Sequence, residues 1–207
     1  MKASAEFKKA TPALMLPKAE AICKRLSDLI LSSLALLCLS PALLLIAITI
    51  KFDSPGPMLF RQRRVGLNGR HFEIYKFRTM LCGTPDIPTD QMMRYQSPVT
   101  RAGKFLRKTS LDELPQLINV LKGEMSLVGP RPALYNQTEL TAKRAAQGVL
   151  GFPPGITGWA QVNGRDELPD DSKVELDTWY CNHWSYWLDW KILLSTLHAV
   201  LSRRGAL

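Results

Sequence analysis

The feature that most constrains this chain is a long uncharged segment near its N-terminus. Residues 29–50, LILSSLALLCLSPALLLIAITI, contain no charged side chain. As a helix this segment would extend about 33 Å, enough to cross the hydrocarbon core of a bilayer. A cleaved signal peptide is the weaker alternative, because its apolar region is normally shorter and ends at a small-residue cleavage site. The sequence therefore predicts a membrane segment.

The middle and the flanks of this segment bear on how it enters the membrane. Ser40-Pro41 lies at its centre, where proline removes a backbone donor and should kink the helix, with the Ser40 hydroxyl available to the freed carbonyls. Both flanks are basic, with Lys24 and Arg25 before the segment and Lys51 after it. Positive residues favour the cytoplasmic side, so both ends of the segment are expected on the cytoplasmic face of the membrane. We expect a bent, re-entrant hairpin, with a kinked helix passing straight through as the alternative.

Charge and cysteine content narrow the range of partners. Lysine and arginine outnumber the acids 27 to 18, giving a net charge of +9 at neutral pH. This balance indicates an anionic partner: nucleic acid, a phospholipid surface or a phosphorylated substrate. The four cysteines are scattered without a C-x-x-C pair, which indicates neither a disulfide framework nor structural zinc. Reduced cysteines that face the cytosol are the default expectation.

Two adjacent carboxylates mark the stretch where chemistry is expected. Asp112 and Glu113 lie within residues 107–132, RKTSLDELPQLINVLKGEMSLVGPRP. Ser110 stands three residues before Glu113, the spacing of a capping box, and Pro115 is tolerated only in a first helical turn. We therefore expect both acids in the first turn of a helix that ends at Gly123. The apolar face of that helix would comprise Leu114, Leu117, Ile118 and Leu121.

The acidic pair has a structural and a functional interpretation. Acids near a helix N-terminus often only cap free N–H groups and complement the macrodipole. The cations around this pair favour function, because carboxylates among cations stay ionised at neutral pH. Side chains at neighbouring positions point about 100° apart on a helix, so a division of labour is the simpler hypothesis. One carboxylate could attack a phosphorus atom while the other holds a divalent cation on the phosphate oxygens. The cations are Arg101, Lys104, Arg107 and Lys108 before the pair and Arg131 in the rigid turn 129–132 after it.

A basic β-hairpin is predicted between the membrane segment and the acidic pair. Residues 58–61 and 71–77 alternate as strands do, and Gly66-Leu67-Asn68-Gly69 separates them. Lys76 and Arg78 would lie on the same side of a strand, spaced to grip one phosphate group. The alternative is a hairpin whose basic residues face solvent or anionic lipid headgroups. Residues 82–100, polar and rich in proline, predict a loop.

The remaining segments predict short elements and a second set of polar donors. Residues 138–148 predict a short helix, and GFPPGITG at 151–158 predicts rigid turns. Gln161, Asn163 and Arg165 offer donors beside an aromatic ring and could bind a nucleotide base or sugar phosphate, with an Asn-Gly turn as an equal alternative. The acidic run 166–171 indicates a solvated loop rather than a metal site.

The C-terminal part of the chain concentrates tryptophan and tyrosine in one short region. Such rings prefer the membrane interface, and a following apolar stripe that ends at Arg203 and Arg204 suits a helix lying on that interface. Packing into an ordinary core is the alternative. The stripe comprises Ile192, Leu193, Leu197, Val200 and Leu201.

Six motifs, in order along the chain, together resemble one protein family. They are Ser40-Pro41 in the apolar segment, KFRTM at 76–80, SLDELP at 110–115, GPRP at 129–132, PGITG at 154–158 and QVNGR at 161–165. From about Lys24 to Arg204 the chain resembles the bacterial sugar transferases, the monotopic phosphoglycosyl transferases. Any one motif alone would be a weak signal, whereas six in sequence are specific.

The resemblance implies an α+β fold at the cytoplasmic membrane of a bacterium. Residues 1–22 would be a lead-in, residues 23–53 a membrane-inserted re-entrant helical hairpin bent at Ser40-Pro41, and residues 54–207 a small, mostly helical catalytic domain facing the cytoplasm. That domain would include the short β-hairpin and interfacial amphipathic helices. No large extension precedes the apolar segment, which suggests a minimal catalytic unit.

The resemblance also implies the reaction: transfer of a sugar 1-phosphate from a UDP-sugar to undecaprenyl phosphate, with release of UMP, as the first membrane step of surface glycan assembly. Asp112 would be the nucleophile that forms a covalent phosphosugar intermediate, and Glu113 would bind or position Mg²⁺. Phosphate groups would be held by Lys76, Arg78, Arg107 and Arg131, and the donor also by Gln161, Asn163 and Arg165. Membrane phospholipid is an expected partner and nucleic acid is not, and the assembly could be a homo-oligomer.

Two departures from the family pattern leave the sugar open. Residues 147–152 are less basic than expected before Pro154, and the acidic run 166–171 is unusual.

Two other functions compete with the transferase. A membrane-anchored basic module could bind lipid or nucleic acid without catalysis. A conventional metal-dependent glycosyltransferase would release UDP rather than UMP, although no Asp-x-Asp motif favours it.

Overall fold

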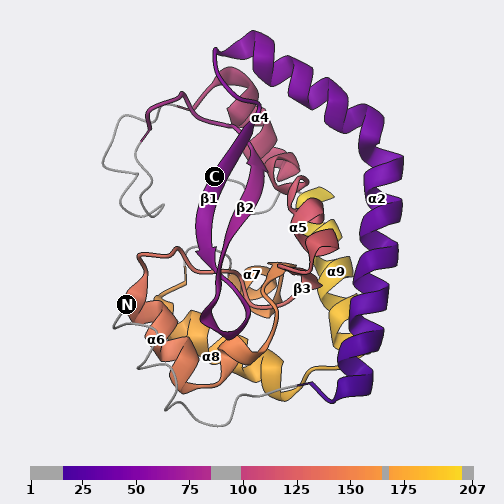
Figure 1. Ribbon diagram of the computed structural model, residues 1–207, viewed down its shortest axis with the longest axis vertical. Coiled ribbons are helices and arrows are strands. Elements are labelled where there is room, and N and C mark those ends of the chain that lie inside the picture. Colours follow the sequence, from indigo (N-terminus) through magenta and orange to yellow (C-terminus); the bar gives the residue numbers. More distant parts are fainter. Residues whose placement is uncertain (1–15, 85–98, 165–167, 202–207) are drawn as a thin grey trace.

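The computed structural model describes residues 16–84, 99–164 and 168–201 of the chain. The fold is α+β and mostly helical, with two small two-stranded sheets. In Figure 1 the β-hairpin of residues 59–77 lies at the centre, with the long N-terminal helix on its right and the helices of residues 138–146 and 170–182 below it. The helices are α2 (Lys18–Asp53), α4 (Arg101–Thr109), α5 (Gln116–Lys122), α6 (Thr138–Ala146), α7 (Trp159–Gly164), α8 (Asp170–Asn182) and α9 (Tyr186–Leu201). The strands are β1 (Leu59–Val65), β2 (His71–Phe77), β3 (Ser126–Val128) and β4 (Gly155–Thr157), and 3₁₀ turns cover Leu67–Gly69, Leu111–Glu113 and Val149–Gly151.

The apolar segment forms one helix, α2, of 36 residues with Pro41 inside it. Figure 1 shows that α2 bends in its upper half. Proline cannot donate to the carbonyl oxygen of Leu37, and the hydroxyl of Ser40 donates to that oxygen instead at 2.8 Å. The predicted help from Ser40 is thus confirmed. The helix begins at Lys18, so it continues across the expected boundary between residues 22 and 23, and residues 1–15 of the expected lead-in lie outside the described part.

Both ends of α2 contact the same folded body. Near the N-terminal end, Lys24 forms an ion pair with Asp189 of α9 at 2.5 Å, and Arg25 donates to the carbonyl oxygen of Leu121 at 2.9 Å. At the other end, Ile50 is buried, and the Asp53 carboxylate accepts from the backbone N–H of Ala102. The outward side of the helix carries exposed apolar side chains along its whole length: Ile22, Leu26, Ile30, Leu34, Leu37, Leu44, Leu45, Ile48 and Phe52.

The predicted hairpin is confirmed, with a first strand that extends to Val65. β1 and β2 pair antiparallel from Leu59 opposite Phe77 to Val65 opposite His71. Asn68 in the turn has a positive φ of 54°, which asparagine tolerates better than most residues. Side chains alternate across the sheet, so Gln62, Ile74 and Lys76 share one face.

The segment around the acidic pair differs from the expected capping box. Ser110 adopts the left-handed conformation, with φ 56°, where it ends α4, and its side chain caps nothing in the following turn. Asp112 and Glu113 therefore lie in a 3₁₀ turn, and α5 begins only at Gln116. The expected apolar face is also partly wrong, because Ile118 is 39% exposed while polar Gln116 and Asn119 are buried. The stop at Gly123, with φ 84°, is confirmed.

The second sheet joins two segments that the sequence indicated only as turns. β3 and β4 run parallel, with Ser126 opposite Gly155 and Val128 opposite Thr157. The first residue of β4 comes very close to the residue that follows β3: a Cβ on Gly155 would lie 2.1 Å from the backbone nitrogen of Gly129. Glycine is therefore required where the 129–132 turn leaves the sheet. The predicted helix at 138–148 is confirmed as α6, two residues shorter.

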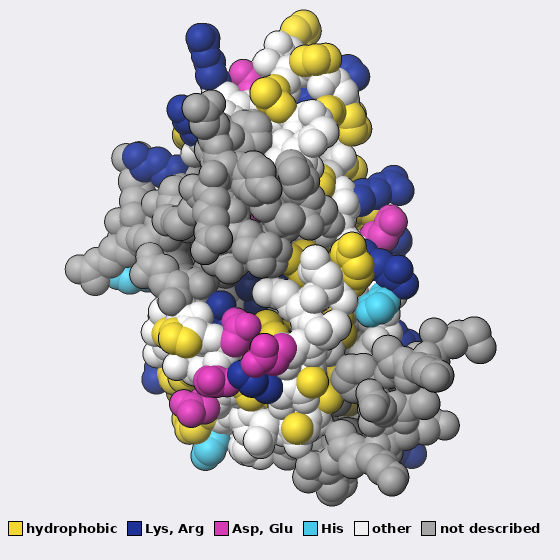
Figure 2. Space-filling model, turned by 90° about the vertical axis from the view of Figure 1, so that its left-hand side faces the viewer, with side chains coloured by type: hydrophobic (Ala, Val, Ile, Leu, Met, Phe, Trp, Pro, Cys, Tyr) yellow, Lys and Arg dark blue, Asp and Glu magenta, His cyan; other side chains and the backbone are white. Residues whose placement is uncertain are grey.

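The C-terminal helices pack partly into the core and partly expose apolar side chains, so each of the two interpretations of the aromatic region, core packing and an exposed apolar stripe, holds in part. Tyr180 and Ile192 are fully buried, so α8 and α9 contribute to the main core. In α9, Trp187 and Leu194 point outward, with 79% and 62% exposure, and Trp190 and Leu197 are also exposed. The expected interfacial stripe is thus shifted, because Ile192 belongs to the core. Figure 2 shows apolar side chains at the top of the molecule, at the height where α2 ends in Figure 1, and a mixed acidic and basic group lower down.

Candidate active site

The acidic pair lies where the β1–β2 hairpin, the 3₁₀ turn and the 129–132 turn meet. Glu113 accepts hydrogen bonds from two cations that are far from it in the sequence. Lys76 Nζ lies 2.7 Å from Glu113 Oε1, and Arg131 Nη2 lies 2.7 Å from the same oxygen. Arg131 Nη1 also approaches Glu113 Oε2 at 3.4 Å, so the guanidinium fork faces both carboxylate oxygens. The structure thus brings together three of the predicted site residues.

Asp112 occupies a different environment from its neighbour. It is half-buried, and among the described residues no cationic side chain lies within ion-pair distance of its carboxylate. The charges of Lys76, Glu113 and Arg107 all act on it. Within the described part of the chain, its carboxylate therefore lies beside the charged cluster without being neutralised by a direct contact.

The pKa values of the two carboxylates move in opposite directions. Burial raises the pKa of Asp112, and the charge of Glu113 adds to this, whereas Lys76 and Arg107 oppose it. Burial would also raise the pKa of Glu113, but the charges and hydrogen bonds of Arg131 and Lys76 outweigh it and hold that pKa well below its usual range. The two acids are therefore chemically distinct, as the hypothesis of a division of labour requires.

Lys76 is the cation most affected by this environment. Burial lowers its pKa, and the charges of Arg131 and Arg64 lower it further, while Glu113 acts in the opposite direction. The side chain stands on β2 next to the end of the hairpin, so the register of the two strands determines where its ammonium group lies.

Arg107 is positioned by a close approach of α4 to the segment after β2. Arg107 Nε donates to the hydroxyl of Thr79 at 3.0 Å. The approach depends on Gly103, because a Cβ there would lie 2.0 Å from the carbonyl oxygen of Thr79. The side of α4 that faces the molecule thereby directs a guanidinium toward the acidic pair.

Arg131 is supported from below by a buried arginine that sequence reasoning did not single out. Arg144 of α6 donates to the carbonyl oxygen of Arg131 at 2.7 Å and to Asp177 Oδ2 at 2.6 Å. Both Arg144 and Asp177 are almost fully buried. A basic residue in an amphipathic helix gives no signal of such a role, since most of them are solvated.

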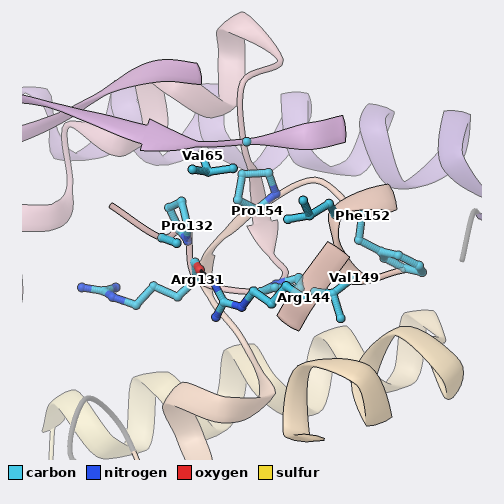
Figure 3. A pocket seen from close by; sticks show the side chains of 11 residues that line it. Val65, Arg131, Pro132, Arg144, Val149, Phe152 and Pro154 are labelled. Atoms are coloured by element: carbon cyan, nitrogen blue, oxygen red, sulfur yellow. Dashed lines mark hydrogen bonds between the residues drawn. The ribbon is translucent and has the colours of Figure 1, made fainter. Parts of the chain in front are cut away.

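A small pocket lies beneath the 129–132 turn. Its volume is about 20 Å³, roughly the room that one water molecule needs, so it cannot hold a nucleotide sugar. Figure 3 shows the side chain of Arg131 extending away from this pocket, whereas Arg144 lies against the turn. The pocket is thus part of the support for Arg131 rather than a substrate site.

Arg78 does not join the cluster. Its guanidinium is buried at the C-terminal end of α2, where Nη1 donates to the carbonyl oxygen of Pro55 at 2.9 Å and Nη2 donates to that of Ser54 at 2.7 Å. These contacts tie the end of α2 to the end of the hairpin. The expectation that Arg78 grips a phosphate together with Lys76 finds no support in this geometry.

The second predicted set of donors is only partly described. Gln161 lies in α7 with both polar atoms of its amide buried, and neither atom has a hydrogen-bond partner among the residues that the structure describes. Asn163 is exposed and donates to the carbonyl oxygen of Trp159 at 2.8 Å. Arg165 lies outside the described residues. The amide of Asn163 thus caps its own helix, whereas that of Gln161 is enclosed rather than open to solvent.

The donor set can be compared with the needs of Mg²⁺. Among residues 16–84, 99–164 and 168–201, no group of three or more His, Cys, Asp or Glu side chains gathers in one place. Mg²⁺ is commonly held by one or two carboxylates together with substrate phosphates. Glu113, the predicted ligand, fits that arrangement, because one carboxylate could hold the ion together with the diphosphate of the donor.

The sequence of this chain is similar to those of several known proteins. The family described as "Bacterial sugar transferase" matches residues 19–203. The chain is 43% identical over 191 residues to the uncharacterised sugar transferase EpsL of Bacillus subtilis, a match that covers 89% of this chain and 90% of that protein.

Two further relatives have names that state a reaction. The UDP-glucose:undecaprenyl-phosphate glucose-1-phosphate transferase of Escherichia coli is 44% identical over 182 residues, covering 84% of this chain and 39% of that protein. The protein of the same name from Caulobacter vibrioides is 41% identical over 190 residues, covering 88% and 71%. The chain therefore spans about two fifths of the length of some relatives and most of the length of others.

Proposed function

Because the chain belongs to the bacterial sugar transferase family, we propose that it transfers a sugar 1-phosphate from a UDP-sugar to undecaprenyl phosphate and releases UMP. The names of several relatives support this reaction. The observation that carries the proposal is the contrast between the two carboxylates: Glu113 is neutralised by Lys76 and Arg131, while Asp112 stands beside them with a raised pKa.

Asp112 is the better nucleophile of the pair. An ionised carboxylate with a higher pKa is more basic and attacks phosphorus more readily, whereas two hydrogen-bonded cations withdraw electron density from Glu113. In the first step an Asp112 oxygen forms a bond to the β-phosphorus of the donor, and the bond from that phosphorus to the bridging oxygen breaks. UMP leaves with the bridging oxygen, and the sugar phosphate stays on Asp112.

In the second step an oxygen of the polyprenyl phosphate attacks the same phosphorus. The bond to Asp112 breaks, the carboxylate is regenerated, and the product is a polyprenyl diphosphate sugar. Lys76, Arg107 and Arg131 neutralise the charge that two phosphate-bearing substrates bring together. Glu113 would hold Mg²⁺ together with the substrate phosphates, and the ion would supply Lewis-acid polarisation of the phosphate oxygens.

The proposed site requires α2 to lie at the cytoplasmic membrane as a re-entrant helix, with the catalytic domain facing the cytoplasm. α2 is long and apolar enough to cross a membrane. Both of its ends are attached to the same domain, by Lys24 and Arg25 at one end and by Ile50 and Asp53 at the other. A domain on one side of the bilayer can hold both ends only if the helix enters and leaves by that side. The acceptor phosphate would then reach Asp112 at headgroup level.

The test is product identification with detergent-purified protein, polyprenyl phosphate and a panel of UDP-sugars. The proposal predicts UMP, whereas a conventional glycosyltransferase would release UDP and a binding module would release neither. Asp112→Asn should abolish UMP release, because an amide cannot form the intermediate. The matched control, Glu139→Gln, removes an exposed carboxylate on α6 and should leave turnover unchanged.

Trapping provides the second readout. Incubation with donor labelled at the β-phosphorus, without acceptor, should leave label on the wild-type protein and none on Asp112→Asn. Full turnover by Asp112→Asn, or product formation without any labelled protein, would remove Asp112 from its role.

A further inference from the structure

Asn119 is a fully buried polar residue on α5 whose side chain belongs to none of the predicted site positions. It makes hydrogen bonds with two different segments of the chain. Its Oδ1 accepts from the backbone N–H of Tyr75 at 3.0 Å, and its Nδ2 donates to the carbonyl oxygen of Glu73 at 2.7 Å. Nδ2 also donates to Glu124 Oε2 at 2.7 Å. A buried amide with this many partners links elements rather than filling space.

The two bonds to β2 replace a missing strand neighbour. Among the strands that the structure describes, β2 pairs with β1 alone, and the N–H of Tyr75 and the C=O of Glu73 belong to its other edge. An asparagine amide offers one acceptor and one donor, as a residue of an adjacent strand would. Asn119 therefore attaches α5 to β2 at one defined position along the strand.

This attachment lies between the two groups that meet in the site. Lys76 is the residue next to Tyr75 on β2, and Glu113 is in the turn that leads into α5. The Lys76–Glu113 ion pair at 2.7 Å thus connects the same two elements that Asn119 joins. A shift of α5 along β2 would separate the ammonium group from the carboxylate and would carry Asp112 with it.

We propose that Asn119 is a positioning residue for the transferase: it holds the turn with Asp112 and Glu113 at the point on β2 where Lys76 meets Glu113. This inference rests on the proposed function. Leucine at position 119 would fill similar space but leave the N–H of Tyr75 and the C=O of Glu73 without partners. Aspartate could accept from Tyr75, but it could not donate to Glu73, and it would face the carboxylate of Glu124.

The experiment compares Asn119→Leu and Asn119→Asp with two controls. Val120→Ala removes packing from the adjacent, fully buried position on α5 but leaves the polar link to β2 intact. Glu124→Ala removes one partner of Asn119 but leaves both bonds to β2. Val120→Ala therefore shows the effect of lost stability alone, and Glu124→Ala shows the effect of losing the Asn119–Glu124 hydrogen bond alone. Neither control removes the hydrogen bonds from Asn119 to β2.

The first readout is steady-state kinetics of UMP release. Both Asn119 variants should lower kcat by about tenfold to a hundredfold, the effect expected when reacting groups are displaced by about 1 Å. KM for the donor should change much less. Val120→Ala and Glu124→Ala should keep kcat within about twofold of wild type, even where Val120→Ala lowers Tm more.

The second readout does not depend on activity. Hydrogen–deuterium exchange of the Tyr75 amide reports the attachment of α5 to β2 without substrate. The N–H of Tyr75 loses its acceptor in Asn119→Leu, so its exchange should become faster there and stay unchanged in Glu124→Ala. Unchanged exchange of the Tyr75 amide in Asn119→Leu, or equally fast exchange in Val120→Ala, would overturn the inference. Absence of UMP release by the wild type would contradict the proposed function alone, because the exchange of the Tyr75 amide would still report the attachment.

Discussion

Asp112 and Glu113 are adjacent in the chain but differ in every contact that determines their chemistry. Glu113 meets Lys76 and Arg131, which are 37 and 18 residues away, while Asp112 is affected by the same charges only at longer range. The sequence indicated that carboxylates among cations stay ionised, and the low pKa of Glu113 agrees with that expectation. The raised pKa of Asp112 differs from it, because burial outweighs the attraction of the nearby cations.

These opposed shifts predict the pH dependence of turnover. Asp112 must lose its proton to attack, so activity should fall as pH drops through its raised pKa, above the range of an ordinary aspartate. Lys76 must keep its proton to hold phosphate, so activity should fall as pH rises through its lowered pKa, below the range of an ordinary lysine. The profile of log(kcat/KM) should therefore be bell-shaped with both limbs displaced toward neutrality.

Lys76→Arg provides the check on the alkaline limb. Arginine does not lose its proton in proteins, so this variant should retain the acid limb and lose the alkaline one. An alkaline limb at the same pH in Lys76→Arg would assign it to another group.

Among the elements, α4 shows how a helix brings a residue to the site by packing rather than by sequence proximity. Gly103 and Leu106 are its buried residues, while Lys104 and Phe105 are exposed. The buried side brings Arg107 to the hydroxyl of Thr79. A glycine inside a nine-residue helix has a cost in conformational entropy, and the contact with Thr79 explains why it is there.

Gly103→Ala tests the packing of α4 against Thr79, because the substitution either raises or lowers the free energy of unfolding. Without a steric conflict, alanine would stabilise the helix by about 1 kcal/mol. A Cβ placed 2.0 Å from a backbone oxygen forces α4 away from Thr79, so we expect a net loss of about 1–3 kcal/mol and reduced turnover through displacement of Arg107. Urea unfolding and Tm measure the change. Lys104→Ala, the exposed neighbour, should alter stability by less than about 0.5 kcal/mol. A stabilised Gly103→Ala protein would contradict the account.

At the scale of the whole molecule, α2 combines a length and apolar character sufficient to cross a membrane with contacts to distant parts of the chain. Its ion pair with Asp189 joins residues 165 positions apart, and Asp189 also accepts from the hydroxyl of Tyr180 at 2.7 Å and from Trp184 Nε1 at 3.2 Å. One carboxylate therefore links the N-terminal part of α2 to the core beneath α9. The opposite, apolar side of α2 stays exposed from Ile22 to Phe52.

Site-directed labelling tests the proposed re-entrant topology. After replacement of Cys23, Cys38, Cys82 and Cys181, which are free thiols, single cysteines are introduced at residues 20, 37 and 55. With an impermeant thiol reagent, residues 20 and 55 should react only after the cells are opened. Residue 37, at the apolar centre, should resist the reagent throughout. Reaction of either residue 20 or residue 55 in intact spheroplasts would instead establish a helix that crosses the membrane.

Local patterns in the sequence predicted the elements whose formation depends on near neighbours. These include the apolar helix with its compensation at Ser40, the hairpin around 66–69, the stop at Gly123 and the helix that begins at Thr138. The family motifs also placed the acidic pair at the centre of the expected site. Each of these rests on side-chain periodicity or on backbone preferences within a few residues.

Tertiary structure decided which side chains meet. It placed Lys76 and Arg131 on Glu113, directed Arg78 to the end of α2 instead, and buried Asn119 and Arg144 as links between elements. It also made Ser110 a left-handed stop rather than a cap. These outcomes depend on contacts between segments that are distant in the chain, and only the packing of whole elements determines which buried polar groups find partners.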